Sequence, residues 1–199
     1  MKARDNPFRS ECLAEIPYRF EKVSLADSAR ELAILGWRAA VVGPHGSGKT
    51  TFLREMRAWL IRAGFRVHHL VLTEECAHFP PGFMRQISRG LAPDDFILLD
   101  GCEQMNGVEW FRFKWLTRGA AGLLITTHRE GRLPTLLQTR ASPALIGNLV
   151  RDLTGRGAEA SLCHRLYQAH GGNVREVLRE LYDLCAEDKS LDRFAPVSV

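Results

Sequence analysis

The sequence contains few of the features that mark membrane, secreted or zinc-binding proteins. No apolar run approaches the length of a membrane span, and the polar N-terminus lacks the apolar core of a signal peptide. The five cysteines include no C-x-x-C pair and their number is odd, which argues against a disulfide framework and against a structural zinc site. We therefore expect a cytoplasmic protein whose cysteines are buried, reduced thiols.

Lysine is also scarce, so the positive charge of the chain comes mainly from arginine. Only five of the 27 basic residues are lysine, and with 23 acidic residues the formal net charge is +4. The arginines are spread along the chain and form no run. The charge therefore permits a nucleic-acid partner without indicating one.

The length and composition are those of a globular protein with one α/β core and a small appendage. Apolar residues make up 45% of the 199 residues and charged residues 25%. Strand and helix patterns alternate from Ala39 to about Thr139, which predicts a parallel sheet with helices on both faces. Strands are expected at 39–42, 65–73, 96–100, 122–127 and 133–139. Helices are expected at 24–35, 50–63, 83–91 and 108–118, the first of them capped by Ser24 and Asp27.

The pattern changes after Ser142, where three helices and no strands are expected. These helices are predicted near 142–153, 158–170 and 173–186, and they form a small helical subdomain. Two prolines and scattered aromatic residues between 6 and 20 predict an extended N-terminal arm. The expected organisation is an arm and helix at 1–35, a core at 36–141, a helical lid at 142–187 and a frayed tail at 188–199.

The strongest functional signal is a glycine-rich loop between a predicted strand and a predicted helix. It fits the pattern G-x-x-x-x-G-K-[ST], and with the residue that follows it consists of Gly43, Pro44, His45, Gly46, Ser47, Gly48, Lys49, Thr50 and Thr51. The glycines allow the backbone to approach phosphate oxygens, and the N–H groups at the start of the helix attract them. Lys49 can reach the β- and γ-phosphates, and the Thr50 hydroxyl can bind Mg²⁺.

The loop therefore predicts binding of a nucleoside triphosphate, with Mg-ATP as the expected ligand. The sequence has no N-K-x-D segment that would read guanine, so GTP is disfavoured.

Acidic residues after the third predicted strand are candidates for metal binding and hydrolysis. Asp100 ends that strand, and in folds with this loop a carboxylate at such a position holds Mg²⁺ together with the loop hydroxyl. The alternative for Asp100 is a cap of the next turn. Hydrolysis also needs a group that orients the attacking water, and Glu103 is the first candidate. Glu74, Glu75 or an absent hydrolysis step remain alternatives.

Polar residues also follow the fourth predicted strand. Thr127 and His128 can each hydrogen-bond the attacking water or a phosphate oxygen, unless they are solvated loop residues. Arg129 and Arg132 follow, either as arginine fingers or as solvated surface side chains.

Arg175 lies in the first turn of the last predicted helix, after the expected N-cap Asn173. A cation in that position opposes the helix dipole, and a phosphate would explain it. Pairing with Glu176 or Glu180 would explain it equally well.

Four aromatic residues follow the acidic strand end. On a helix Trp110 and Phe113 share one face, and Phe111 and Trp115 share another. Core packing explains one pair, and the other pair could belong to a partner surface.

Taken in order, these motifs resemble those of small AAA+-type ATPases of the additional-strand, catalytic-glutamate class. The matching parts are the loop GPHGSGKT, the strand FILLDG, the sensor-like LLITTH and the helix start GGNVRE, which resembles the sensor 2 motif. They cover about residues 36–186. The opening Asn6-Pro7-Phe8 resembles an arm that lies near adenine in some members. The resemblance implies a five-stranded parallel sheet in the order 5-1-4-3-2, ATP between sheet and lid, and Arg175 reaching the γ-phosphate.

Two departures from the family pattern bear on function. Gly101 stands where a glutamate usually follows the aspartate, and the segment between the fourth and fifth strands is too short for the helix that usually carries an arginine finger. A monomeric, switch-type ATPase that acts on a protein partner fits these departures, although the oligomeric state stays open. The alternatives are a small-molecule kinase and a nucleotide-binding scaffold without turnover.

Overall fold

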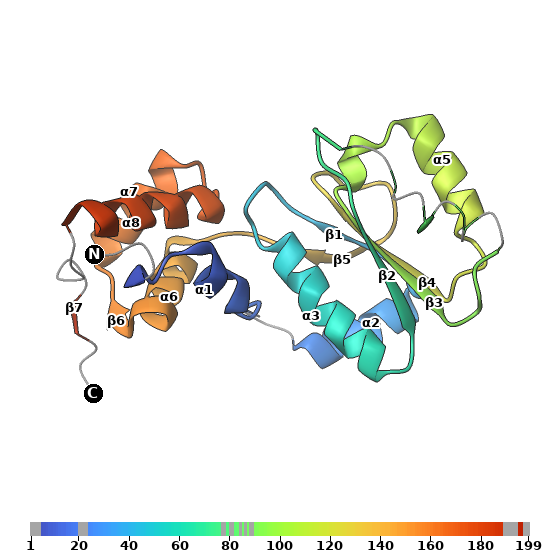
Figure 1. Ribbon diagram of the computed structural model, residues 1–199, viewed down its shortest axis with the longest axis horizontal. Coiled ribbons are helices and arrows are strands. Elements are labelled where there is room, and N and C mark those ends of the chain that lie inside the picture. The colour runs from blue at the N-terminus through green and yellow to red at the C-terminus, as the bar shows by residue number, and fades with distance from the viewer. Residues whose placement is uncertain are drawn as a thin grey trace. The chain divides into compact units, whose positions relative to one another are not determined.

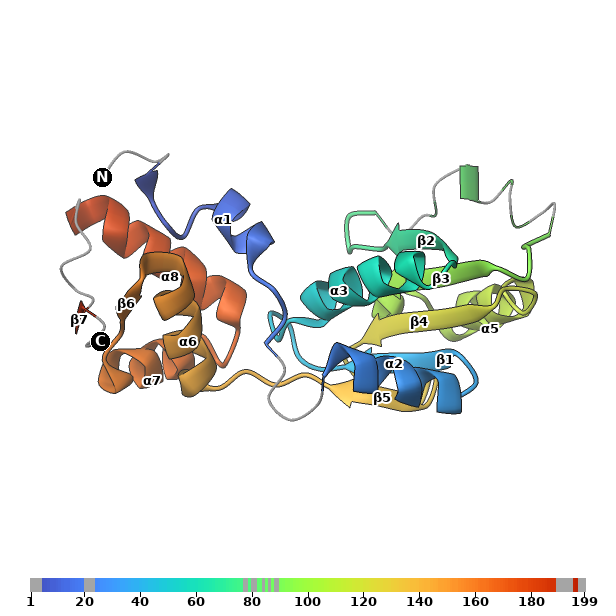
Figure 2. The same cartoon turned by 90° about the horizontal axis from the view of Figure 1, so that it is seen from below.

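The computed structural model describes residues 5–19, 24–76, 79, 82–83, 85, 87, 90–188 and 195–196 (Figures 1 and 2). The chain divides into two compact units. The sheet unit comprises 20–43 and 49–139, and the helical unit comprises 1–19, 44–48 and 140–199. The two ends of the glycine-rich loop therefore belong to the sheet unit, and its tip belongs to the helical unit. Among the helices of the described residues, none has both the length and the apolar character needed to cross a membrane.

Within the described residues, the sheet unit is built on five parallel strands in the order β2-β3-β4-β1-β5. Their bounds are β1 Arg38–Val42, β2 Arg66–Val71, β3 Asp95–Asp100, β4 Gly122–Thr127 and β5 Thr135–Gln138. Strands β3 and β4 are buried along their whole length, as expected for apolar strands in the middle of a covered sheet. The α/β class and the strand order implied by the resemblance are confirmed.

Helices cover both faces of the sheet. Helices α2 and α3 lie on one face and α5 lies on the other (Figures 1 and 2). Their bounds are α2 Leu25–Ile34, α3 Lys49–Arg62 and α5 Gly107–Leu116. The predicted cap of α2 is present as a capping box between Ser24 and Asp27. Of the helix expected at 83–91, only Phe83, Arg85, Ile87 and two further residues are described, and these three are helical.

The helical unit contains the three predicted C-terminal helices and a short helix in the N-terminal arm. Their bounds are α1 Ser10–Glu15, α6 Pro143–Thr154, α7 Ala160–Ala169 and α8 Val174–Asp188. One apolar cluster joins α6, α7 and α8, and Phe8 from the arm is buried in it with only 2% of its surface exposed. The arm is thus held by the hydrophobic effect, as an integral part of this core.

Several sequence predictions are wrong in detail. The arm is not wholly extended, because α1 forms in it, and Leu13 of α1 and the following Ile16 pack on the apolar cluster. Six residues are too few for periodicity to reveal a helix. A two-residue antiparallel pair, β6 (Arg156–Gly157) with β7 (Ala195–Pro196), lies in the part of the chain where no strands were expected. Residues 189–194 and 197–199 of the predicted frayed tail lie outside the described residues.

The prediction that the cysteines are buried holds only in part. All five are free thiols, and Cys102, Cys163 and Cys185 are buried. Cys12 is half-buried and Cys76 is exposed, because Cys76 lies in the turn that follows β2.

Asp95, expected to precede the third strand, is instead its first residue and is 1% exposed. Its Oδ1 accepts hydrogen bonds from Arg66 Nε at 2.5 Å and pairs with His68 Nε2 at 2.7 Å, and its Oδ2 accepts from the backbone N–H of Ala92 at 2.6 Å. Burial by itself raises the pKa of Asp95, but the hydrogen bonds from Arg66, His68 and Ala92 outweigh it and hold the pKa below the ordinary value.

We expect Asp95→Asn to lower the free energy of unfolding by roughly 1–3 kcal/mol at pH 7, because the variant loses a buried, charged acceptor for the donors of Arg66, His68 and Ala92. A lowered carboxyl pKa stabilises the fold above the unfolded pKa of about 3.9, and this contribution disappears as the pH falls through the folded pKa. Urea unfolding at pH 7, 5 and 3 should therefore show a difference from wild type that shrinks at the lowest pH. Asp94→Asn is the matched control, since Asp94 is exposed and lies 3.4 Å from Arg66. An equal loss in both variants, or one independent of pH, would contradict this account.

Candidate functional site

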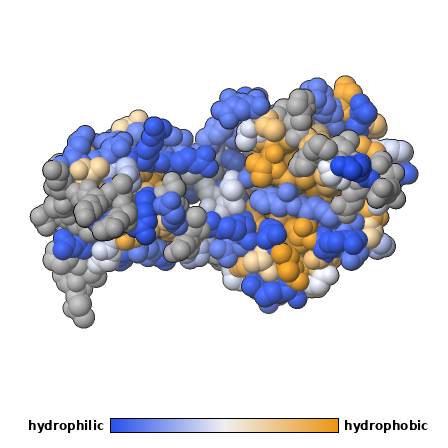
Figure 3. Space-filling model, viewed as in Figure 1, coloured by the Kyte–Doolittle hydropathy of each residue, from blue (hydrophilic) through white to orange (hydrophobic). Residues whose placement is uncertain are grey.

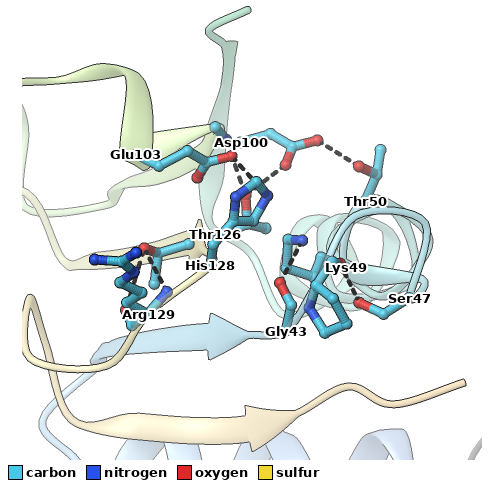
Figure 4. Close-up of polar contacts among 12 residues, drawn as sticks. Gly43, Ser47, Lys49, Thr50, Asp100, Glu103, Thr126, His128 and Arg129 are labelled. Atoms are coloured by element: carbon cyan, nitrogen blue, oxygen red, sulfur yellow. Dashed lines mark hydrogen bonds and ion pairs between the residues drawn. The ribbon is translucent and has the colours of Figure 1, made fainter. Parts of the chain in front are cut away.

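The glycine-rich loop begins where β1 ends and finishes where α3 begins, so one lysine can tie its two ends together. Lys49, the first residue of α3, is 8% exposed, and its Nζ donates a hydrogen bond to the backbone oxygen of Gly43 at 2.8 Å (Figure 4). The N–H groups of the first turn of α3, from Lys49 to the half-buried Thr51, have no acceptor within the helix. A buried ammonium and a helix N-terminus at one place suit an anion.

The two predicted metal ligands meet in the sheet unit. The Thr50 hydroxyl donates to Asp100 Oδ2 at 2.7 Å, and Asp100 is only 9% exposed (Figure 4). Parallel pairing causes this meeting, because it places the carboxyl ends of β3, β4 and β1 at one edge of the sheet. A hydroxyl and a carboxylate are hard oxygen donors of the kind that Mg²⁺ takes together with water and phosphate, so these residues fit the metal.

Thr126 completes the arrangement and was missed in the sequence. Its hydroxyl donates to Asp100 Oδ1 at 2.5 Å and accepts from the backbone N–H of Gly101 at 2.8 Å. Each carboxylate oxygen of Asp100 thus accepts a hydrogen bond from a hydroxyl, one on α3 and the other on β4. The available signal was a polar residue within an otherwise apolar, buried strand, since a buried hydroxyl must find partners.

Gly101 explains why the glutamate of the family pattern is absent. Its φ is +84°, and a Cβ added there would lie 2.1 Å from the backbone oxygen of Leu72. No side chain fits that space, because Leu72 belongs to the backbone that continues β2 and its N–H bonds to Asp100. The chain instead turns into a short 3-10 helix, η2 (Cys102–Gln104), which carries Glu103.

Glu103 and His128 are brought together at the same sheet edge. Glu103 Oε1 lies 3.1 Å from His128 Nε2, and each side chain is about a quarter exposed (Figure 4). The second oxygen of Glu103, Oε2, is buried and has no hydrogen-bond partner among the described residues. A buried acceptor without a partner costs free energy, which a bound water would recover. The other candidate acids, Glu74 and Glu75, are exposed.

Thr127 forms contacts within the turn after β4. It is 3% exposed, and its hydroxyl donates to the backbone oxygen of Arg129 at 3.2 Å and lies 3.4 Å from the Arg129 N–H. These contacts shape the turn that presents His128. A direct contact between Thr127 and phosphate stays a prediction.

The two arginines after β4 differ in their surroundings. Arg132 donates a hydrogen bond to the backbone oxygen of Met105, and its Nη1 lies 3.5 Å from Cys102 Sγ. Its guanidinium carbon lies over the Trp110 ring, 5.4 Å from the ring centroid. It therefore braces η2 and α5 within the chain, and neither sequence alternative for it, finger or solvated side chain, describes it. Arg129 is exposed.

The tip of the loop, Pro44–Gly48, belongs to the helical unit. Ser47 is buried and its hydroxyl donates to the backbone oxygen of Pro44 at 2.7 Å, whereas Pro44 and His45 are exposed. Gly46 has a φ of +68°, and a Cβ there would lie 1.9 Å from Asn173 Oδ1. Gly48 has a φ of +94°, and a Cβ there would approach the ring of Tyr18 to 3.2 Å. Both glycines are thus required by backbone conformation and by close neighbours.

Asn173 connects this loop tip to the last helix. Its Oδ1 accepts from the N–H groups of Arg175 at 3.1 Å and Glu176 at 3.4 Å, so it is the predicted N-cap of α8. Arg175 is exposed, two residues from the contact with Gly46. Asn6 and Phe8 of the arm are both buried in the helical unit. Asn6 donates a hydrogen bond to the backbone oxygen of Tyr182, and Phe8 packs in the apolar cluster.

Comparisons with known proteins bear on the fold. No family model matches the sequence, and no curated protein sequence matches it. Two variants of RuvB from Thermotoga maritima are 16% identical, with TM-scores of 0.53 and 0.52, and cover 83% and 84% of this chain and 62% and 65% of RuvB. NtrX from Brucella abortus, solved in complex with ADP, is 15% identical with a TM-score of 0.55 and covers 99% of this chain and 57% of NtrX.

These matches confirm the resemblance at the level of fold: the chain has the fold of an AAA+ P-loop ATPase. It spans less than two thirds of the length of the RuvB and NtrX chains.

Gly101→Ala should lower the free energy of unfolding by roughly 2–4 kcal/mol, because it combines a left-handed backbone with a clash against Leu72. Gly101→Glu, which would restore the family pattern, should be at least as damaging. Gly107→Ala is the matched control: Gly107 is the first residue of α5, and a Cβ there meets nothing within 4 Å. Chemical denaturation of the three variants measures the difference. A Gly101→Glu variant as stable as wild type would show that the Leu72 backbone yields easily.

Proposed function

We propose that this chain binds Mg-ATP through the loop from Gly43 to Thr51 and hydrolyses it, acting as a nucleotide-dependent switch on a protein partner. The observation that carries the proposal is the contact between Thr50 and Asp100, 50 residues apart, beside the buried Lys49. An accidental glycine turn would require neither the lysine nor the paired oxygens at this place. NtrX, which has the same fold, was solved in complex with ADP, and this supports an adenine nucleotide as the ligand.

The polar residues of the candidate site that lie in the sheet unit each have a role in this proposal. Lys49 would exchange the Gly43 oxygen for β- and γ-phosphate oxygens, and the N–H groups up to Thr51 would add neutral donors. Thr50 and Asp100 would hold Mg²⁺, which supplies charge neutralisation at the transferred phosphoryl group. Thr126 keeps the Asp100 carboxylate oriented toward the Thr50 hydroxyl.

Glu103 is the residue proposed to orient the attacking water. One of its oxygens is engaged by His128, and the other is a buried acceptor without a partner among the described residues, which suits a water molecule. His128 is thus a positioning residue for Glu103, and Thr127 in turn shapes the turn that bears His128.

Arg175 is proposed to contact a phosphate held at the loop tip. It lies two residues after Asn173, whose side chain contacts Gly46 of that tip. Its position in the first turn of α8 opposes the helix dipole, and a phosphate would compensate for this. A conformational change that depends on bound nucleotide would change the affinity of the chain for a partner.

ATP binding and steady-state ATP hydrolysis, measured together for wild type, Lys49→Ala and Glu103→Gln, test the proposal. Lys49→Ala should weaken ATP binding by about tenfold or more, because it removes a charge-assisted hydrogen bond. Glu103→Gln should bind ATP as wild type does and lower kcat by about 10²–10⁴, the usual range for loss of a general base. Glu75→Gln is the matched control and the test of an alternative acid, and it should leave kcat unchanged.

Two outcomes would redirect the proposal. Binding without turnover above background in wild type would leave a nucleotide-stabilised scaffold, or a switch whose hydrolysis needs its partner. Failure of wild type to bind ATP, ADP or any other nucleoside triphosphate would exclude nucleotide binding.

A further inference from the structure

Helix α5 carries an apolar stripe that the protein leaves exposed. Val108, Phe111 and Trp115 are 70%, 68% and 56% exposed, and their spacing of three and four residues places them in one row along the helix. The opposite face of the same helix is buried: Trp110 and Phe113 are 9% and 2% exposed and pack in the core of the sheet unit. The sequence expectation that one aromatic pair serves the core while the other is at the surface is confirmed.

Cationic side chains border this stripe on both sides. On the helix Arg112 lies on one side of the row formed by Val108, Phe111 and Trp115, and Lys114 lies on the other side. Arg118 lies in the turn after the helix, beside Trp115 at the end of the row. All three cations are exposed, and the Arg118 guanidinium lies 4.7 Å from the centroid of the Trp115 ring. The acidic residue of this helix, Glu109, accepts a hydrogen bond from the Asn106 N–H in a capping box at the helix start. Figure 3 shows hydrophobic residues reaching the surface of the sheet unit next to hydrophilic ones.

We propose that Val108, Phe111 and Trp115, with the border of Arg112, Lys114 and Arg118, dock an amphipathic helix of a partner protein whose apolar face is flanked by Asp and Glu. A row of side chains at helical spacing fits the groove between the rows of another helix. Carboxylates on both sides of the partner's apolar row would then meet the cations of the border, which fixes register and speeds association.

The same observations argue against the other occupants. A second copy of this chain would bring two cationic borders against each other, which is unfavourable. Stacking of nucleic-acid bases needs open ring faces, and the Arg118 guanidinium covers one face of Trp115. Val108, the most exposed member of the row, offers no ring at all.

The proposed surface is physically connected to the candidate site, although it does not depend on nucleotide. Helix α5 begins three residues after η2, and Arg132 joins η2 to α5 through Cys102 and Trp110. A partner docked on α5 would therefore lie on the element that directly follows Glu103.

The test uses two fluorescent helical peptides with the same apolar row, one flanked by glutamates and one by lysines. Anisotropy titrations with the full chain, without nucleotide, should show the glutamate peptide binding at least about tenfold more tightly. The triple variant Val108→Ser, Phe111→Ser, Trp115→Ser should lose this binding. Ile34→Ser is the matched control, because it removes a side chain that is 77% exposed at the end of α2 and should change nothing.

A second variant guards against loss of fold. Arg112→Glu with Arg118→Glu retains the apolar row and should reverse the preference toward the lysine peptide, which an unfolded chain would not do. Lys49→Ala should bind the glutamate peptide as wild type does, so failure of this proposal and failure of nucleotide binding give different results.

Three further probes cover the other occupants. Vesicles of phosphatidylcholine and phosphatidylserine, an oligothymidine strand and the chain itself at high concentration are each compared for wild type and the triple Ser variant. Stripe-dependent binding to any of these in place of the glutamate peptide, or equal binding of both peptides, would overturn the proposal.

Discussion

The carboxylate of Asp100 is held between two hydroxyls, and the rest of the site is arranged around it. Thr50 reaches it from α3 and Thr126 from β4, while Asp100 itself ends β3. This arrangement requires that β3 and β4 run in parallel and that α3 starts directly after the loop. A change of one residue in the register of β4 would turn Thr126 to the other face of the sheet. The apolar packing of the two central strands therefore indirectly determines the polar chemistry at their ends.

The close approach of β2 to Asp100 determines where an acid can be placed. The backbone of Leu72 bonds to Asp100 and fills the space beside Gly101, so a side chain directly after Asp100 is excluded. The chain bends there in the left-handed conformation that glycine tolerates, and the following η2 presents Glu103 to His128. The departure from the family pattern at Gly101 is thus a consequence of packing, with Glu103 as the acid next available. Arg132 and Trp110 tie this bend to α5, whose outer face carries the exposed stripe.

Much of the fold and part of the site could be predicted. The glycine loop, the apolar runs of β3 and β4 and the capping residues Ser24 and Asn173 act over a few neighbouring residues, so pattern alone was enough for them. The α1 helix, the β6–β7 pair and the burial of Asp95 could not be predicted, because each depends on contacts with residues distant in sequence. Thr126 was overlooked for the same reason: only the pairing of β3 with β4 shows which of two adjacent threonines faces Asp100.

The sequence by itself determined the α/β class, the glycine-rich loop and the residue types of the candidate site, because each of these depends on residue types at fixed spacing within a short segment. It also determined that Phe111 and Trp115 lie on a different face of their helix from Trp110 and Phe113, since helical period decides that. Only the tertiary structure decided which pair is exposed, why Gly101 bears no side chain, and that Arg132 is engaged within the chain. All three features depend on distances between segments that are far apart in the sequence, and the packing of the folded chain sets those distances.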